Sequence, residues 1–122
     1  MDTKQVIVMR HDLGMRRGKQ IAQGSHASMA FLSRRVQSGK LELSPAMQHW
    51  LDHSFTKVCV RVDSEDALME IYQKALDAEL EVHLVTDQGK TEFHGEPTKT
   101  CLAIGPDESN RIDEVTKDLK LL

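Results

Sequence analysis

The sequence predicts an α/β domain with a mixed sheet covered by helices on both faces. Short runs rich in Val and Ile alternate with longer segments of helical periodicity, and 122 residues suit one domain. This alternation favours parallel strands joined by right-handed crossovers. The last two strands are separated by a loop without a helix, which indicates an antiparallel pair. The expected order along residues 1–122 is therefore β-α-(α)-β-α-β-β-α.

The first strand and the first helix are separated by a short polar loop. KQVIVMR (4–10) is an apolar run between charges, which is typical of a buried strand. After the loop HDLGMRRG, a helix is expected from about Arg17 to Ser38, with Gly39 as its stop.

This helix has three sides when it is drawn at 100° per residue. The broad apolar side, expected to face the sheet, consists of Ile21, Ala22, Ser25, Met29, Leu32 and Val36. A second side would let another helix approach, from the same chain or a partner subunit; it consists of Gly24, Ala27 and Phe31. A stripe along the edge of the core face consists of Lys19, Gln23, His26, Ala30 and Ser33.

The later elements carry their own start and stop signals. Ser44 as an N-cap before Pro45 predicts a short helix over 44–53, and Ser64 caps a third helix. Alternating valines predict a strand over 55–62. The remaining elements are expected at 82–86 (strand), 100–106 (strand, ended by Gly-Pro) and 107–118 (helix).

No leader or membrane segment is expected, because no apolar run approaches the ~18 residues that a membrane span needs. Cys59 and Cys101 lie in strand-like runs and form no CxxC pair, which is typical of free, buried thiols. We therefore expect a cytoplasmic protein.

Basic residues are concentrated near the N-terminus, although the net charge is -3. Residues 1–40 carry eight Lys and Arg side chains against two acidic ones, whereas residues 41–122 carry eight against 17. Such asymmetry is typical of a basic face for a polyanion on an acidic body, unless the charges mix in space after folding.

The start of the first helix has the features of an anion site. Free backbone N–H groups and the helix dipole favour negative charge there, and Arg16, Arg17 and Lys19 add full positive charges. A plainer alternative is open for the stripe and its neighbours: Ser25 bonds back to the preceding turn, and His26 is a core histidine.

A second candidate segment is the loop TDQGKTEF. Asp87 ends a predicted strand, where open α/β sheets place ligand sites, and Gly89 allows a sharp turn. An ordinary solvated turn is the plainer alternative for this loop. His49 and His53 have i, i+4 spacing, but no HExxH motif or nearby cysteine accompanies them, so we expect no metal site. GxSxG and GxGxxG motifs are absent, which argues against a serine hydrolase and a dinucleotide-binding protein.

Three segments, in order and at suitable spacing, resemble the type II peptidyl-tRNA hydrolases. DQGKTE is similar to the family's Asp-x-Gly-basic-Thr-Gln/Glu loop, and TCLAIGP followed by IDEVTKDLKL is similar to its C-terminal end. RRGKQIAQGSHA resembles the family's Lys-rich signature, with matching positions at Lys19, Gln23, Ser25, His26 and Ala27.

The resemblance implies a three-layer α/β/α fold with a mixed, mainly four-stranded sheet, in a homodimer. It implies hydrolysis of the ester that joins a peptide to the terminal ribose of tRNA, with no metal and no organic cofactor. Peptidyl-tRNA is then the expected partner, and we expect neither DNA nor a membrane as a partner.

Ester hydrolysis needs an attacking water, a proton acceptor and positive charge for the developing oxyanion. We expect Lys19 to stabilise the oxyanion or the leaving ribose oxygen, Thr91 to donate a hydrogen bond, and Asp87 to position or deprotonate water. As a base, Asp87 would need partial burial to raise its pKa. His26 is the rival acceptor, but we expect it to be buried against the sheet and to orient the site. The expected substrate-binding residues are Arg16, Arg17, Gln23, Ser25, Lys90 and Thr100.

Two alternatives are consistent with the same sequence. One is a non-catalytic RNA- or protein-binding module on the same fold, and the other is a hydrolase of a different acylated RNA.

Overall fold

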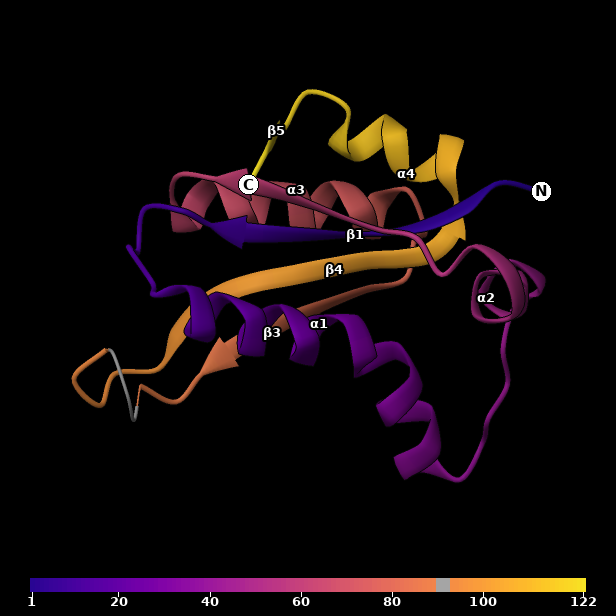
Figure 1. The fold of residues 1–122 in the computed structure, drawn as a ribbon, viewed down its shortest axis with the longest axis horizontal. Coiled ribbons are helices and arrows are strands. Elements are labelled where there is room, and N and C mark those ends of the chain that lie inside the picture. The colour runs from indigo at the N-terminus through magenta and orange to yellow at the C-terminus, as the bar shows by residue number, and fades with distance from the viewer. Residues whose placement is uncertain (90–92) are drawn as a thin grey trace.

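A computed structural model describes residues 1–89 and 93–122 of the protein. In that part of the chain, five strands form one mixed sheet in the order β3-β4-β1-β2-β5 (Figure 1). The strands are β1 (Thr3–Arg10), β2 (Lys57–Val62), β3 (Val82–Asp87), β4 (Thr98–Glu108) and β5 (Lys120–Leu121). The helices are α1 (Arg17–Ser38), α2 (Pro45–His49), the π-helix η1 (Trp50–Ser54), α3 (Glu65–Asp77) and α4 (Ser109–Thr116).

Strand directions bring three strand ends to one edge of the sheet. β1 pairs with β2 in parallel, and β4 pairs antiparallel with both β1 and β3. β1, β2 and β3 therefore all run the same way, and their carboxyl ends meet at one edge. This is the edge at which open α/β sheets bind ligands.

Helices cover both faces of the sheet, as the sequence predicts (Figure 1). On one face, Val6, Val60 and Ile104 pack with Leu68 of α3 and Ile112 of α4. On the other face, Ile7, Met9 and Ala103 pack with Ala27 of α1. A third apolar cluster joins Phe31 of α1 to Met47 and Trp50.

The side of α1 that faces the sheet differs from the predicted one. Gln23, Gly24, Ala27, Ser28 and Phe31 are its buried residues. The predicted sheet-facing side is solvent-exposed instead, with Ile21, Met29 and Val36 exposed by 69%, 59% and 62%. Mostly small residues face the sheet: a Cβ at Gly24 would already be in van der Waals contact with the end of Met9, at 3.7 Å, so a longer side chain there would meet Met9. The side of α1 that packs on the sheet is therefore the one with small side chains, whereas hydrophobicity alone predicted the side with Ile21 and Met29.

Helix boundaries follow the predicted capping signals closely. α1 spans the expected residues and ends at Gly39, whose φ is 78°. The Ser44 and Ser64 side chains accept hydrogen bonds from the N–H groups of Met47 and Ala67, as N-caps do.

Other predicted features need correction. The sheet has a fifth described strand, β5, whose two residues pair with Val60 and Arg61 and are too few to carry a periodic signal. β4 continues past Gly105 to Glu108, because pairing with β1 extends it. Cys101 is buried, but Cys59 is exposed, because it lies on the opposite side of β2 from the valines.

Helices in the described part of the chain are all too short or too polar to cross a lipid bilayer.

Candidate active site

The start of α1 and the end of β3 meet at the carboxyl edge of the sheet. They enclose a pocket of about 250 Å³, lined by Lys19, Gln23 and His26 of α1 and by residues 85–88. Lys19 Nζ donates to Asp87 Oδ1 at 2.7 Å, and the two side chains are only 13% and 12% exposed. The structure thus brings together two predicted site residues that are far apart in the sequence.

A chain of hydrogen bonds holds the Asp87 carboxylate in place. Gln23 Nε2 donates to Asp87 Oδ1 at 3.3 Å, and the backbone N–H of Gly89 donates to Oδ2 at 2.8 Å. Gln23 Oε1 in turn accepts a hydrogen bond of 2.5 Å from the fully buried Thr100 hydroxyl. Both oxygens of Asp87 are therefore fixed by donors, and Gln23 is fixed by β4.

Gly89 is required by the turn that follows β3. Its φ is +79°, and a Cβ at this position would lie 2.3 Å from the carbonyl oxygen of Glu96. The Gly89 carbonyl also accepts a hydrogen bond of 2.7 Å from Gly95 N–H. A side chain would push the turn apart and move the N–H away from Asp87.

The pKa of Asp87 is lowered, mainly because Lys19 donates a hydrogen bond to the carboxylate. Burial opposes this shift, but the Gly89 N–H and the charges of Lys19 and His26 add to the lowering. Base catalysis by Asp87 would need a raised pKa, and the shift has the opposite direction. The prediction that Asp87 deprotonates water is therefore wrong. Asp87 stays ionised near neutral pH and acts as a fixed acceptor.

His26 lies at the mouth of the pocket, and its side chain is exposed to solvent. The expectation that it is buried against the sheet is wrong, because Gln23 and Ala27 occupy the sheet-facing positions on either side of it. An exposed imidazole beside the Lys19–Asp87 pair is accessible to a bound substrate and to water.

The other predicted site residues are distributed around this pocket. Arg16 and Arg17 are exposed at the start of α1, whose first turn carries no acidic residue. Ser25 lies on a different side of α1, where its hydroxyl donates to Ile21 O at 2.8 Å. Thr100 reaches Asp87 only through Gln23. Lys90 and Thr91 lie outside the described residues.

Gln23 and Thr100 were predicted to bind substrate, and the role of Gln23 as a bridge between Thr100 and Asp87 was not predicted. A signal for it exists in the spacing of the stripe: Lys19 and Gln23 are one helical turn apart, so both reach the same carboxylate. The position of Thr100 opposite Gln23 depends on strand register, which the sequence does not encode locally.

The histidine pair at 49 and 53 has its rings in contact, with centroids 4.9 Å apart. His49 Nδ1 lies 2.9 Å from the Thr3 hydroxyl, so one ring is already hydrogen-bonded. Nowhere in residues 1–89 and 93–122 do three His, Cys, Asp or Glu side chains gather in a metal-binding arrangement.

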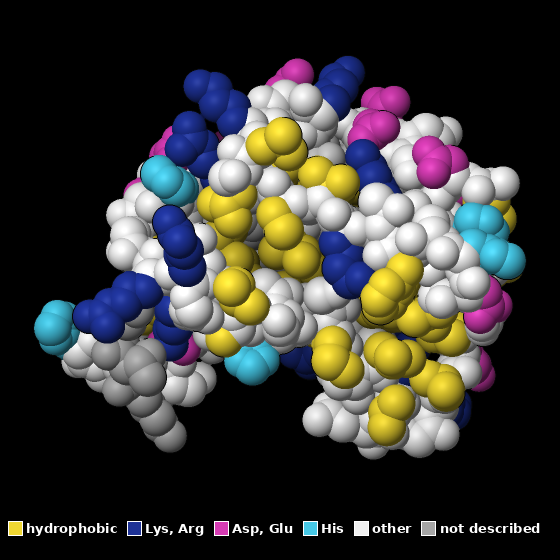
Figure 2. Space-filling model, in the orientation of Figure 1, with side chains coloured by type: hydrophobic (Ala, Val, Ile, Leu, Met, Phe, Trp, Pro, Cys, Tyr) yellow, Lys and Arg dark blue, Asp and Glu magenta, His cyan; other side chains and the backbone are white. Residues whose placement is uncertain are grey.

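A larger, apolar groove of about 660 Å³ lies on another side of α1. Its floor includes Ile7 and Met9, and its walls include Ile21 and Met29 of α1 and Trp50. Figure 2 shows hydrophobic side chains over the middle of this face, and Lys and Arg side chains toward the left, where α1 begins. Lys57 is the charged residue of the groove lining, whereas the smaller pocket brings together Lys19, His26 and Asp87.

Comparisons with known proteins identify the family. The model of the family "Peptidyl-tRNA hydrolase PTH2" matches residues 3–122. A peptidyl-tRNA hydrolase of Methanocaldococcus jannaschii is 42% identical over 121 residues, which cover 98% of this chain and 99% of the relative. One from Aeropyrum pernix is 42% identical over 97% of this chain and 94% of the relative.

Among solved structures, a protein of unknown function from Agrobacterium tumefaciens C58 is similar in fold. It has a TM-score of 0.62 and 16% identity, and the match covers 100% of this chain and 98% of that one. At that identity, the likeness concerns the fold alone. The family match over nearly the whole chain, together with the full-length archaeal relatives, shows that this chain belongs to the peptidyl-tRNA hydrolase PTH2 family.

Proposed function

We propose that this protein hydrolyses the ester bond between peptide and tRNA in peptidyl-tRNA, and so returns free tRNA to translation. One observation carries the proposal: Lys19 and Asp87 form a largely buried ion pair in a pocket beside a basic helix start. The chain also belongs to a family whose archaeal relatives are named for this activity. The reaction takes place in the cytoplasm, where peptidyl-tRNA arises.

The pocket supplies the parts that direct attack by water requires. The Lys19 ammonium stabilises the negative charge that develops on the carbonyl oxygen of the ester. Asp87, which is ionised and held by donors, orients both Lys19 and the attacking water. His26, at the mouth of the pocket, accepts the proton of the water and returns it to the leaving ribose oxygen. The water oxygen ends in the peptide carboxylate, and the C–O bond to the ribose breaks.

The exposed cations at the start of α1 bind the tRNA backbone. Arg16 and Arg17 lie next to backbone N–H groups at the helix start, where phosphate groups bind favourably. These contacts hold the polyanion near the pocket and take no part in proton transfer.

Product analysis on a defined N-acetylaminoacyl-tRNA tests the function. We expect the acyl group to be released from this substrate, and free aminoacyl-tRNA to be hydrolysed much more slowly. Binding without release would indicate an RNA-binding module. Release from both substrates at equal rates would indicate a hydrolase of other acylated RNAs.

Arg17→Ala is expected to weaken binding of the substrate and to leave the saturated rate nearly unchanged. Loss of one phosphate contact raises KM, most clearly at moderate salt, and makes the salt dependence of binding shallower by about one counterion. Steady-state kinetics across a series of KCl concentrations measure both effects. A fall in kcat at unchanged KM would assign Arg17 to the chemistry instead.

We also propose that the protein is a homodimer in which the apolar groove of each subunit receives α1 of the other. The groove lies beside the exposed Ile21 and Met29 ridge of α1, so one patch holds both a hollow and a protrusion. Such a patch is self-complementary about a two-fold axis. The predicted contact face of Gly24, Ala27 and Phe31 is buried within the subunit, but Gly24 and Phe31 also line the groove.

Met29→Glu should convert the dimer to a monomer, because it places two like charges in an apolar contact. Met29 is 59% exposed, so the fold itself should tolerate the change. Sedimentation velocity at micromolar concentration measures the state, with Leu76→Glu, an exposed position on α3, as the control. A wild-type protein that sediments as a monomer would contradict the proposal.

A further inference from the structure

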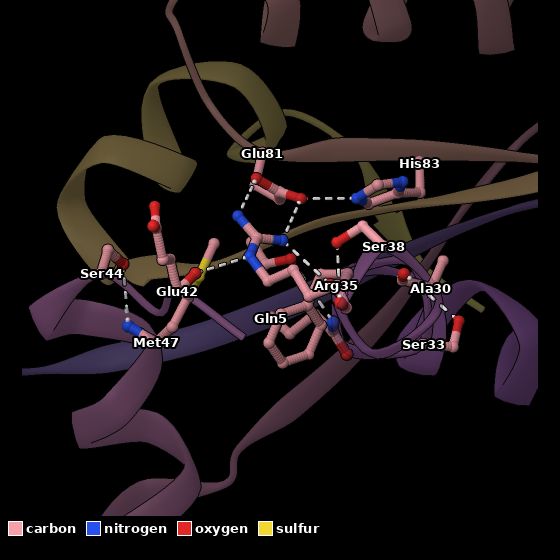
Figure 3. A network of polar contacts seen from close by, with 12 residues as sticks. Gln5, Ala30, Ser33, Arg35, Ser38, Glu42, Ser44, Met47, Glu81 and His83 are labelled. Carbon is pink, nitrogen blue, oxygen red and sulfur yellow. Dashed lines mark hydrogen bonds and ion pairs between the residues drawn. The ribbon is translucent and has the colours of Figure 1, made fainter. Parts of the chain in front are cut away.

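A second charged cluster lies near the other end of α1, away from the pocket (Figure 3). Arg35 and Glu81 form a two-pronged ion pair, with Nη1 2.8 Å from Oε2 and Nη2 3.2 Å from Oε1. His83 Nε2 donates to Glu81 Oε2 at 2.6 Å. Hydrogen bonds from His83 and Arg35 lower the pKa of Glu81 to about 2, against the effect of burial, so the carboxylate stays charged at neutral pH.

The Arg35 guanidinium donates hydrogen bonds to several segments of the chain. Its Nη1 also donates to Phe31 O at 2.9 Å, and its Nε donates to Glu42 O at 2.8 Å. The backbone carbonyl of Glu81 accepts a hydrogen bond of 2.8 Å from Gly105 N–H of β4. One guanidinium therefore connects α1, the segment after α1 and the start of β3, and that start is itself attached to the sheet.

The two ion pairs are separated by similar distances along α1 and along the β3 segment. Lys19 and Arg35 are 16 residues apart on α1, or roughly 24 Å. Glu81, which immediately precedes β3, and Asp87, its last residue, are six residues apart, or roughly 20 Å in extended backbone. α1 thus runs along β3 in the opposite direction, with an ion pair at each end.

The polar contacts of α1 with the β3 segment lie toward its two ends, at Asp87 and at Glu81. Between them, the sheet-facing residues include Gly24 and Ala27, which have no long side chain to interlock with the sheet. The side-chain hydrogen bonds of this stretch run to the other strands: the buried Ser28 hydroxyl bonds to Gln5 of β1, and Gln23 bonds to Thr100 of β4.

We propose that Arg35, Glu81 and His83 form a positioning cluster that sets where α1 lies along β3, and so keeps Lys19 in contact with Asp87. This inference rests on the proposed hydrolase function. Its effect on the rate follows from geometry, because a displacement of about 1 Å at reacting groups can lower a rate by as much as ~100-fold.

Arg35→Met tests the proposal, because it keeps the length of the side chain and removes the guanidinium. We expect kcat per folded molecule, on N-acetylaminoacyl-tRNA, to fall about tenfold with KM unchanged, since the cations at the start of α1 remain. Arg35→Lys should recover part of the loss, because an ammonium replaces one prong of the pair. In a Lys19→Met background, Arg35→Met should have no further effect on kcat.

A second readout does not depend on activity. Titration of the Asp87 carboxyl by ¹³C NMR should show its pKa rising toward the ordinary range in Arg35→Met, because Lys19 moves away. The matched control is Lys4→Met, which breaks a 2.6 Å ion pair between β1 and α4 on the opposite face. That change should alter neither kcat nor the Asp87 pKa.

An unchanged kcat per folded molecule in Arg35→Met, or an unchanged Asp87 pKa, would overturn the proposal. So would an equal tenfold loss in the Lys19→Met background. If Arg35→Met does not fold, Glu81→Gln takes its place with the same criteria. Failure of the wild-type protein to release the acyl group would contradict the proposed function, while the NMR titration would still decide the positioning role.

Discussion

Asp87→Asn is expected to lower kcat by roughly 10²–10³-fold, the range typical of the loss of one group from a preorganised electrostatic site. The amide is close in size to the carboxylate, but it carries no charge and presents an NH₂ group. That group would face the Lys19 ammonium or the Gly89 N–H, both of which need an acceptor. The attacking water also loses its orienting anion, while tRNA binding at the start of α1 is unaffected.

Single-turnover release of the acyl group from N-acetylaminoacyl-tRNA measures this loss. Asp107→Asn is the matched control: Asp107 is 16% exposed, pairs with Arg111 at 2.9 Å, and lies at the other end of β4. It should keep wild-type turnover. Full turnover in Asp87→Asn would contradict the role of Asp87 in orienting Lys19 and the attacking water.

Lys19→Met is expected to lower kcat by about 10²–10³-fold, as the loss of an oxyanion-stabilising group does. It should also raise the pKa of Asp87, because the Lys19 hydrogen bond is the largest cause of the lowering. The carboxylate would then become protonated at a higher pH than in the wild type. The residual activity of the variant should therefore be lost at a higher pH as acid is added.

The pH dependence of kcat, measured for the wild type and Lys19→Met, checks both effects. Arg17→Ala serves as the control for a lost positive charge at the same helix start, and its acid limb should match that of the wild type. If kcat of Lys19→Met falls but its activity is lost at the same acidic pH as in the wild type, Lys19 stabilises the oxyanion and does not set the pKa of Asp87.

The sequence predicted those parts of the fold that depend on local signals. Caps at Ser44 and Ser64 and the stop at Gly39 are confirmed, because each is encoded within a few residues. The face of α1 was predicted wrongly, because Ile21 and Met29 are exposed where a hydrophobic ranking places them inside. A close helix–sheet contact selects small residues, and nothing local distinguishes such a contact from a helix–helix one.

The sequence predicted which residues line the site better than it predicted their charge states and pKa shifts. The stripe of Lys19, Gln23 and His26 lines the pocket, as its helical spacing indicates. The direction of the Asp87 pKa shift depends on a partner 68 residues away, so only the folded chain determines it. The exposure of His26 depends in the same way on which face of α1 packs on the sheet.

We propose that Lys19 and Asp87 act as one catalytic unit in ester hydrolysis. The single-turnover rate of acyl release from N-acetylaminoacyl-tRNA, measured for the wild type, Asp87→Asn, Lys19→Met and the double variant, tests this claim. Residues that act as a unit are strongly non-additive, so the double variant should be no slower than about the slower single variant. A double variant whose loss equals the product of the two single losses would contradict the claim.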